Sequence, residues 1–198
     1  MKRALMIGAA IFALIFVGCS TKVTRVDTSE TIDISGDWND ADSRMTGEKM
    51  IKDMLNERWL ARFYADAKKT PVLTVGEIKN LSHEHINTQT FMNDIQRAVI
   101  NSGEARFIAA RDDRVSARDE RKEQDQYARE DARKKERQEI GADFIVGGAI
   151  NTIIDGEGKT AIKFYQVDLT LTNIETQEIV WNGQEKIKKL VENKKVRP

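Results

Sequence analysis

Apolar residues recur every three to four positions in the first half of the chain, which is the period of a helix. One such stripe predicts a helix over about residues 43–65 and consists of Ile51, Leu55, Trp59 and Phe63. A second stripe predicts a helix over residues 88–101. Short apolar runs predict strands at 72–79 and 106–109. The first half therefore alternates helices with short strands.

The last third alternates apolar with polar residues, which is the period of a strand with one buried face. The alternation is clearest over residues 160–172, and apolar runs predict further strands at 144–154 and 179–181. Turn-forming residues at 155–158 and 173–178 separate the three strands. We therefore predict an α+β fold, a single domain whose helices pack on a small, mostly antiparallel sheet that ends in a three-stranded meander.

The start of the chain indicates export and lipidation. Lys2-Arg3 precedes an uncharged run that is too short to span a membrane comfortably, which indicates a signal peptide over residues 1–18. Phe16-Val17-Gly18-Cys19 resembles the bacterial lipobox, in which the cysteine is lipidated, although leucine is usual where this chain has Phe16. The alternative is an ordinary signal peptide with a chance cysteine. We expect Cys19 to be the lipidation site.

The mature chain divides into a tether, a domain and a tail. Residues 19–41 are rich in Thr, Ser and Asp and predict a lipidated N-terminus with a flexible tether. Residues 42–187 are expected to form the globular domain, and residues 188–198 a frayed basic tail. Ser20 follows the cysteine, and by analogy with enteric lipoproteins this favours the outer membrane, with the protein facing the periplasm.

Charge is balanced over the whole chain, with 32 basic and 32 acidic residues among 198. Nucleic-acid-binding proteins usually carry an excess of basic residues, and this chain has none. We therefore expect no nucleic-acid partner. The segment 112–139 differs from the rest, because nineteen of its residues are charged and both signs are mixed. Such a pattern predicts a solvated helix or an exposed, partly ordered excursion.

Candidate catalytic and metal-binding residues are few. His83-Glu84-His85 is the segment with ligand chemistry, but two histidines need further ligands, so we interpret it as a solvated loop. Gly147-Gly148 lacks the lysine of a phosphate loop and is typical of a close approach or bulge within a strand. No nucleophile motif is present in the sequence. We therefore predict no enzymatic activity, no cofactor, no metal and no small-molecule substrate.

A polar turn with a tryptophan precedes the first predicted helix. Two interpretations stay open: Trp38 packs back on the domain as part of a cap, or it takes part in binding. The candidate partner-binding residues in this turn are Trp38, Asn39, Asp40, Asp42 and Arg44.

Four segments resemble the LpoB-type outer-membrane lipoproteins. They are Ser35–Ser43 with its Trp-Asn-Asp run, Gly141–Phe144, Tyr165–Thr176 and Trp181-Asn182-Gly183. The resemblance covers nearly all of residues 34–187 and implies helices around a small sheet, as in the N-terminal domain of the periplasmic TolB protein. It also implies that the lipoprotein docks on a bifunctional penicillin-binding protein and activates its peptidoglycan synthesis.

A second function class belongs to the same fold family, namely CsgG-like lipoproteins that assemble outer-membrane secretion channels. Such channels need hairpins with an apolar, lipid-facing side. The segment available for such a hairpin, residues 112–139, is mostly charged. The sequence therefore favours the activator over the channel.

Overall fold

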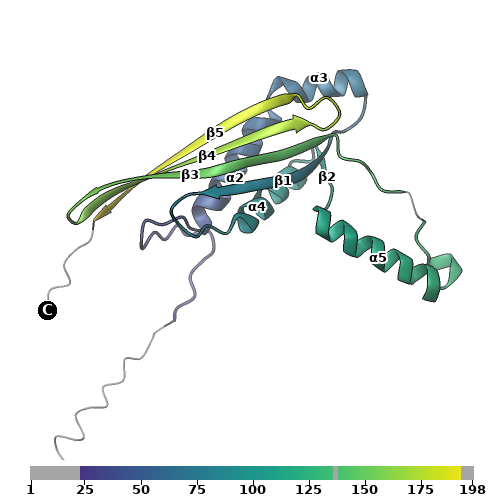
Figure 1. Ribbon diagram of the computed structural model, residues 1–198, viewed down its shortest axis with the longest axis horizontal. Coiled ribbons are helices and arrows are strands. Elements are labelled where there is room, and N and C mark those ends of the chain that lie inside the picture. Colours follow the sequence, from purple (N-terminus) through teal and green to yellow (C-terminus); the bar gives the residue numbers. More distant parts are fainter. Residues whose placement is uncertain (1–22, 136–137, 193–198) are drawn as a thin grey trace, which may run out of the picture. The chain divides into compact units, whose positions relative to one another are not determined.

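The computed structural model describes residues 23–135 and 138–192 and divides the chain into two compact units, Met1–Thr31 and Ile32–Pro198. In the first unit, residues 23–31 form no helix or strand. The predicted signal peptide and Cys19 lie outside the described residues. The second unit contains α2 (Asp40–Leu55), α3 (Arg58–Ala67), β1 (Val72–Leu81), α4 (Thr88–Ser102), β2 (Arg106–Phe107), α5 (Arg111–Tyr127), a 3-10 turn (Glu130–Ala132), β3 (Phe144–Glu157), β4 (Thr160–Asn173) and β5 (Ile179–Glu192) (Figure 1).

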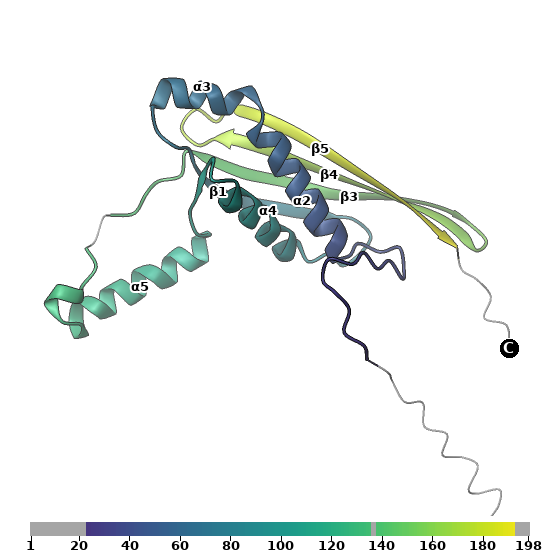
Figure 2. The same ribbon diagram turned by 180° about the vertical axis from the view of Figure 1, so that it is seen from behind.

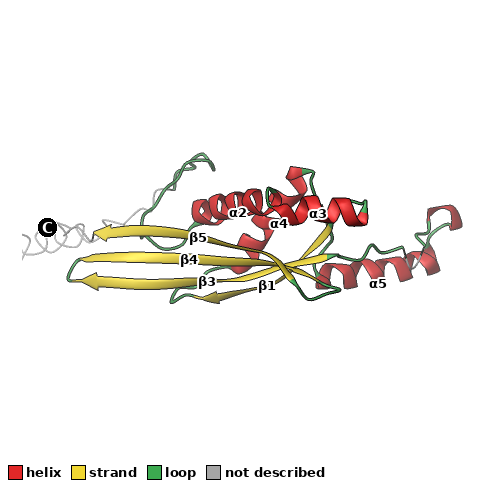
Figure 3. Ribbon diagram, turned by 90° about the horizontal axis from the view of Figure 1, so that it is seen from above, coloured by secondary structure: helices red, strands yellow, loops and turns green. Residues whose placement is uncertain are grey.

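The strands form one mixed sheet in the order β2-β1-β3-β4-β5. β1 pairs in parallel with β2 and with β3, whereas β3, β4 and β5 are successively antiparallel. The antiparallel pairing of β3 with β4 runs along all 14 residues of each strand, so antiparallel pairing predominates. Helices α2, α3 and α4 lie on one face of the sheet (Figure 3). The predicted α+β class and the C-terminal meander are confirmed.

The core lies between that face and the helices. Between Tyr165 and Leu171, every second residue of β4 points into it and is at most 1% exposed, namely Tyr165, Val167, Leu169 and Leu171. The predicted close approach at Gly147-Gly148 is confirmed at Gly148, where an added Cβ would lie 2.1 Å from the carbonyl oxygen of Asp168. The alternation in β4 determines which face of the strand is buried, because a shift of one residue in its register would expose these apolar side chains to solvent.

The predicted helix 43–65 is wrong as a single element, because the chain breaks between α2 and α3. The indole of Trp59 donates a hydrogen bond of 2.7 Å to the carbonyl oxygen of Met54 in the last turn of α2. This bond adds a side-chain donor to a carbonyl at the end of α2 that also accepts the backbone N–H of Glu57 at 3.3 Å. The apolar stripe nevertheless continues across the break, since Leu55 and Trp59 are buried and Phe63 is half-buried.

α2 begins at Asp40, three residues before the start at residue 43 that the sequence predicted. Asn39 is the N-cap: its side chain accepts a hydrogen bond of 3.1 Å from the backbone N–H of Asp42. The carboxylate of Asp42 accepts one of 3.0 Å from the backbone N–H of Asn39. This reciprocal capping box satisfies two free donors and fixes where the helix begins.

The expectation of a short return strand followed by a frayed tail at residue 188 is wrong for 188–192, because β5 continues to Glu192. Its backbone pairs with β4 as far as the register Thr160–Glu192. The lysines that indicated a tail lie within this strand, and Lys189 is bound to carboxylates on other elements. Residues 193–198 lie outside the described part. The turn between β3 and β4 also lies later than predicted, at Gly158-Lys159.

The charged segment is only partly helical. α5 contains no buried residue, and after the 3-10 turn the described residues up to Asp143 form no further helix or strand. Arg118 binds Glu139 with a shortest distance of 2.7 Å, and this hydrogen bond lowers the pKa of Glu139 to about 2. The ion pair holds the returning chain against α5, as expected for a partly ordered excursion. Throughout the described residues, helices are too short or too polar to cross a membrane.

Candidate functional site

The turn that carries the candidate binding residues is fixed on the domain. Trp38 is half-buried, and its ring meets those of Phe91 and Tyr165 edge-on at centroid distances of 6.0 and 5.7 Å. Asn39 and Asp42 form the capping box, Asp40 is exposed, and Arg44 is half-buried. Of the two interpretations of Trp38, packing on the domain is what the structure shows.

Ion pairs hold the same turn to β4 and β5. Lys163 of β4 binds Asp37, and it binds Glu84 at 3.0 Å. Lys189 of β5 binds Asp33 at 2.8 Å, and it also binds the capping residue Asp42 at 2.5 Å. We call this set of contacts, which joins residues 33–42 to Glu84 and to the lysines of β4 and β5, the N-terminal clamp.

Glu84 occupies the centre of the clamp. One of its oxygens accepts the backbone N–H of Trp38 at 3.0 Å, and the other accepts the hydroxyl of Tyr165 at 2.7 Å. The Tyr165 hydroxyl also lies 3.1 Å from the carbonyl oxygen of Gly36. With Lys163, the carboxylate of Glu84 has three hydrogen-bond donors around it. Its hydrogen-bonding capacity is therefore met even though it is partly shielded from water.

The charges of the clamp stabilise one another. The hydrogen bond from Lys163 lowers the pKa of Asp37. Burial acts against the charge of Lys163 and of Lys189, but hydrogen bonds to their carboxylate partners outweigh burial and raise the pKa of both. Burial, and then the hydrogen bond to Glu84, raises the pKa of Tyr165. Asp37 therefore stabilises the fold at pH values above its unfolded-state pKa, and this stabilisation is lost as the pH falls through its lowered folded-state pKa. The clamp is thus closed at neutral pH.

The clamp corrects the predicted extent of the tether. The sequence predicted a flexible segment to residue 41, but residues 33–39 are bound to the domain and α2 begins at Asp40. The compact unit accordingly begins at Ile32. The part of the tether that is not bound to the domain therefore ends near residue 31.

The segment His83-Glu84-His85 serves the clamp. Glu84 binds the N-terminal turn, His83 lies with Nδ1 3.3 Å from the hydroxyl of Thr152, and His85 is exposed. Within residues 23–135 and 138–192, no three His, Cys, Asp or Glu side chains come together as a metal site would require. No local sequence pattern indicated the role of Glu84, because the partners of its side chain are 46 to 81 residues away.

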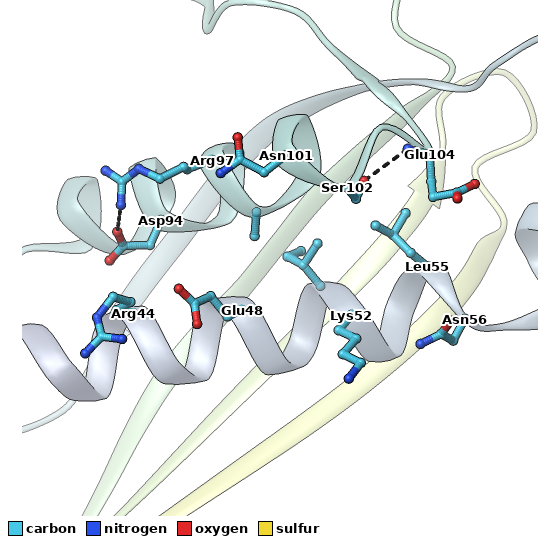
Figure 4. A pocket seen from close by; sticks show the side chains of 12 residues that line it. Arg44, Glu48, Lys52, Leu55, Asn56, Asp94, Arg97, Asn101, Ser102 and Glu104 are labelled. Atoms are coloured by element: carbon cyan, nitrogen blue, oxygen red, sulfur yellow. Dashed lines mark hydrogen bonds and ion pairs between the residues drawn. The ribbon is translucent and has the colours of Figure 1, made fainter. Parts of the chain in front are cut away.

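A groove of about 450 Å³ lies between α2 and α4 (Figure 4), which run side by side on the sheet (Figure 2). Its apolar floor is formed by Ile51, Leu55 and Ala98. Arg44, the only candidate binding residue in this groove, lies near its rim together with Arg97, which binds Asp94 at 2.9 Å. The groove offers an apolar strip between charges of both signs.

A second cleft, of about 320 Å³, lies between α3 and the start of β5. Its floor is aromatic and consists of Trp59, Phe63, Phe144 and Trp181. Arg58 and Arg62 of α3 stand on one rim, and Ile179, which is 58% exposed, stands on the other. Glu57, Asp66 and Glu178 also line the cleft, so its rim carries both charge signs. Aromatic and arginine side chains are typical of protein contacts. Sequence reasoning missed this cleft: it placed Trp59 on an apolar helix stripe and residues 179–181 in a strand.

The two hollows share a chemistry of apolar floors and charged rims. Neither histidine of the chain lines either of them. Such surfaces can bury apolar side chains of a partner. The charges on the rims then favour partners whose surface charge is complementary.

Comparisons with known proteins identify relatives of this domain. The model of the family described as "Peptidoglycan-synthase activator LpoB" matches residues 42–187. A search of the curated proteins found no match.

Solved structures similar to this chain include two LpoB domains. The LpoB C-terminal domain from Escherichia coli is 16% identical, with a TM-score of 0.45 and coverage of 74% of this chain and 98% of that one. The corresponding domain from Salmonella enterica is 14% identical, with a TM-score of 0.42 and the same coverage. Lipoprotein GNA1162 from Neisseria meningitidis is 15% identical, with a TM-score of 0.38, covering 64% of this chain and 88% of its own.

Proposed function

Because the chain belongs to the LpoB family of peptidoglycan-synthase activators, we propose that it binds a bifunctional penicillin-binding protein and raises its rates of glycan polymerisation and crosslinking. The observation that carries the proposal is the family match, which runs from the first helix of the domain into its last strand. The family is one of regulators, so the chemistry belongs to the partner.

The mechanism we propose is a shift of population in the synthase. A binding protein can activate an enzyme only by as much as its affinity for the active conformation exceeds its affinity for the inactive one. A rigid surface serves this purpose, and the apolar floors of the two hollows rest on the packed core. No group of this chain needs to react.

We further propose that the protein is a lipoprotein of the outer membrane that faces the periplasm. The support is the basic start, the short apolar run and the lipobox-like Phe16–Cys19, followed by Ser20. Two acyl chains on one residue give stable anchoring, whereas a single chain is marginal.

Cys19→Ala is expected to leave the domain folded and to abolish membrane attachment. The reason is that every core residue of the described domain lies between Ala41 and Trp181, far from the substituted position. Membrane fractionation and circular dichroism measure the two properties separately. An alanine variant that stays in the outer-membrane fraction at the wild-type level would show that Cys19 is not the anchor.

The activation itself is tested with purified components. We expect the full-length protein to bind a bifunctional penicillin-binding protein of the same organism and to increase its rate of polymerising the lipid-linked disaccharide substrate. A monofunctional transpeptidase from the same cells is the matched control and is expected not to respond. If no bifunctional synthase binds or responds, the proposed function is wrong.

A further inference from the structure

The N-terminal clamp decides which end of the domain lies near the tether. Its lysines lie in β4 and near the end of β5, and Gly36 packs so closely on Val191 that an added Cβ would lie 2.3 Å from a methyl carbon. The tether therefore joins the domain beside the β3–β4 turn and the last residues of β5. We call this the tether end.

The opposite end of the domain is formed by α3 and the turn between β4 and β5 (Figures 1 and 3). We call it the far end. β5 connects the two, from Ile179 at the far end to Glu192 at the tether end. Because a strand rises about 3.3 Å per residue, its 14 residues separate the two ends by about 45 Å.

This separation matters because the free tether is short. From Cys19 to Asp33, where the clamp begins, the chain has 14 residues, which span at most about 50 Å. A docking site at the tether end is limited to that distance from the lipid anchor. A site at the far end reaches almost twice as far. If this chain is anchored in the outer membrane and its synthase in the inner membrane, the synthase meets the far end first.

The far end carries the aromatic cleft between α3 and β5. Its floor is close to the core, since Trp59 is 6% and Trp181 8% exposed, whereas Ile179 on the rim is 58% exposed. Arg58 and Arg62 are exposed on α3, and neither forms an ion pair with another described residue. Three carboxylates, those of Glu57, Asp66 and Glu178, line the same cleft. The cleft thus combines an aromatic floor with a rim of both charge signs, on which two arginines are available to a carboxylate.

We propose that this far-end cleft is the docking site for the synthase, which inserts an apolar side chain over the aromatic floor and places a carboxylate against Arg62 or Arg58. The inference rests on the proposed function and names the surface that performs it. The partner surface that fits is an apolar residue flanked by acidic ones, because arginine binds a carboxylate with two parallel hydrogen bonds.

The test uses substitutions on the exposed rim, which leave the core in place. Ile179→Asp and Arg62→Glu are each expected to weaken binding of the full-length protein to the synthase at least about tenfold. Stimulation of glycan polymerisation should fall in parallel at concentrations where the wild-type protein saturates. The matched control is Leu190→Asp, which makes the same kind of change on the same strand at the tether end, at a residue that is 63% exposed.

The outcomes separate this inference from the proposed function. If the wild-type protein activates the synthase and both rim variants bind with wild-type affinity, the far-end cleft is wrong while the function stands. Loss of binding in Leu190→Asp, or in Arg97→Glu within the groove between α2 and α4, would also overturn it. A wild-type protein that binds no synthase overturns both. Thermal unfolding of each variant confirms that a loss of binding is not a loss of fold.

Discussion

Trp59→Ala is expected to lower the free energy of unfolding by about 3–5 kcal/mol, the usual cost of removing a buried tryptophan. The side chain is 6% exposed and packs against Phe144 with ring centroids 5.0 Å apart. Its indole also donates a hydrogen bond to the carbonyl oxygen of Met54 where α2 ends. The substitution therefore removes both core volume and the contact that joins α2 to α3. Denaturant unfolding followed by circular dichroism measures the change.

The other two tryptophans provide the comparison. Trp181→Ala is expected to cost a similar amount, because this side chain is 8% exposed and lies in the same core. Trp38→Ala is expected to cost clearly less, because Trp38 is only half-buried and its turn is also held by the ion pairs of the clamp. Equal losses in all three variants would contradict this ranking.

Local pattern was sufficient to predict the elements whose neighbours are close in the sequence. The alternation in β4 correctly identified its buried face, and the four-residue spacing correctly identified Ile51, Leu55 and Trp59 as core residues. The fold class follows from the order of such elements, because helices and strands bury their apolar faces against one another in few ways.

The errors arise where contacts distant in sequence decide the structure. β5 contains Lys186, Lys188 and Lys189, which are typical of a solvated tail, and only pairing with β4 makes them a strand. Lysines on such an edge also hinder pairing with other chains. The break before α3 likewise depends on a side-chain bond from Trp59 to the preceding helix.

The candidate site was harder to predict than the fold. The motif around Trp38 was correctly singled out as unusual, but its residues hold the domain's own N-terminal turn through Glu84, Lys163 and Lys189. The far-end cleft joins α3 to residues more than a hundred positions later, such as Ile179 and Trp181. No local pattern indicates that exposed residues so far apart form one cavity.

Deleting residues 22–31 is expected to abolish the function in cells while leaving the purified protein fully able to bind its synthase. The deletion spares Asp33 and the rest of the clamp, so the domain should unfold at the wild-type temperature. It shortens the chain between Cys19 and Asp33 to an extended length of under about 20 Å. Growth of cells that depend on this protein for cell-wall synthesis measures the function.

Replacing residues 22–31 by a Gly/Ser segment of equal length is the matched control and should preserve growth, because such a segment has a similar reach. Inserting further Gly/Ser residues should also be tolerated, since extra length costs little entropy and only widens the range of the domain. If the deletion variant supports normal growth, the partner lies close to the outer membrane. A synthase rooted in the opposite membrane would then be out of range, because even the far end of the domain adds only about 45 Å to the remaining tether.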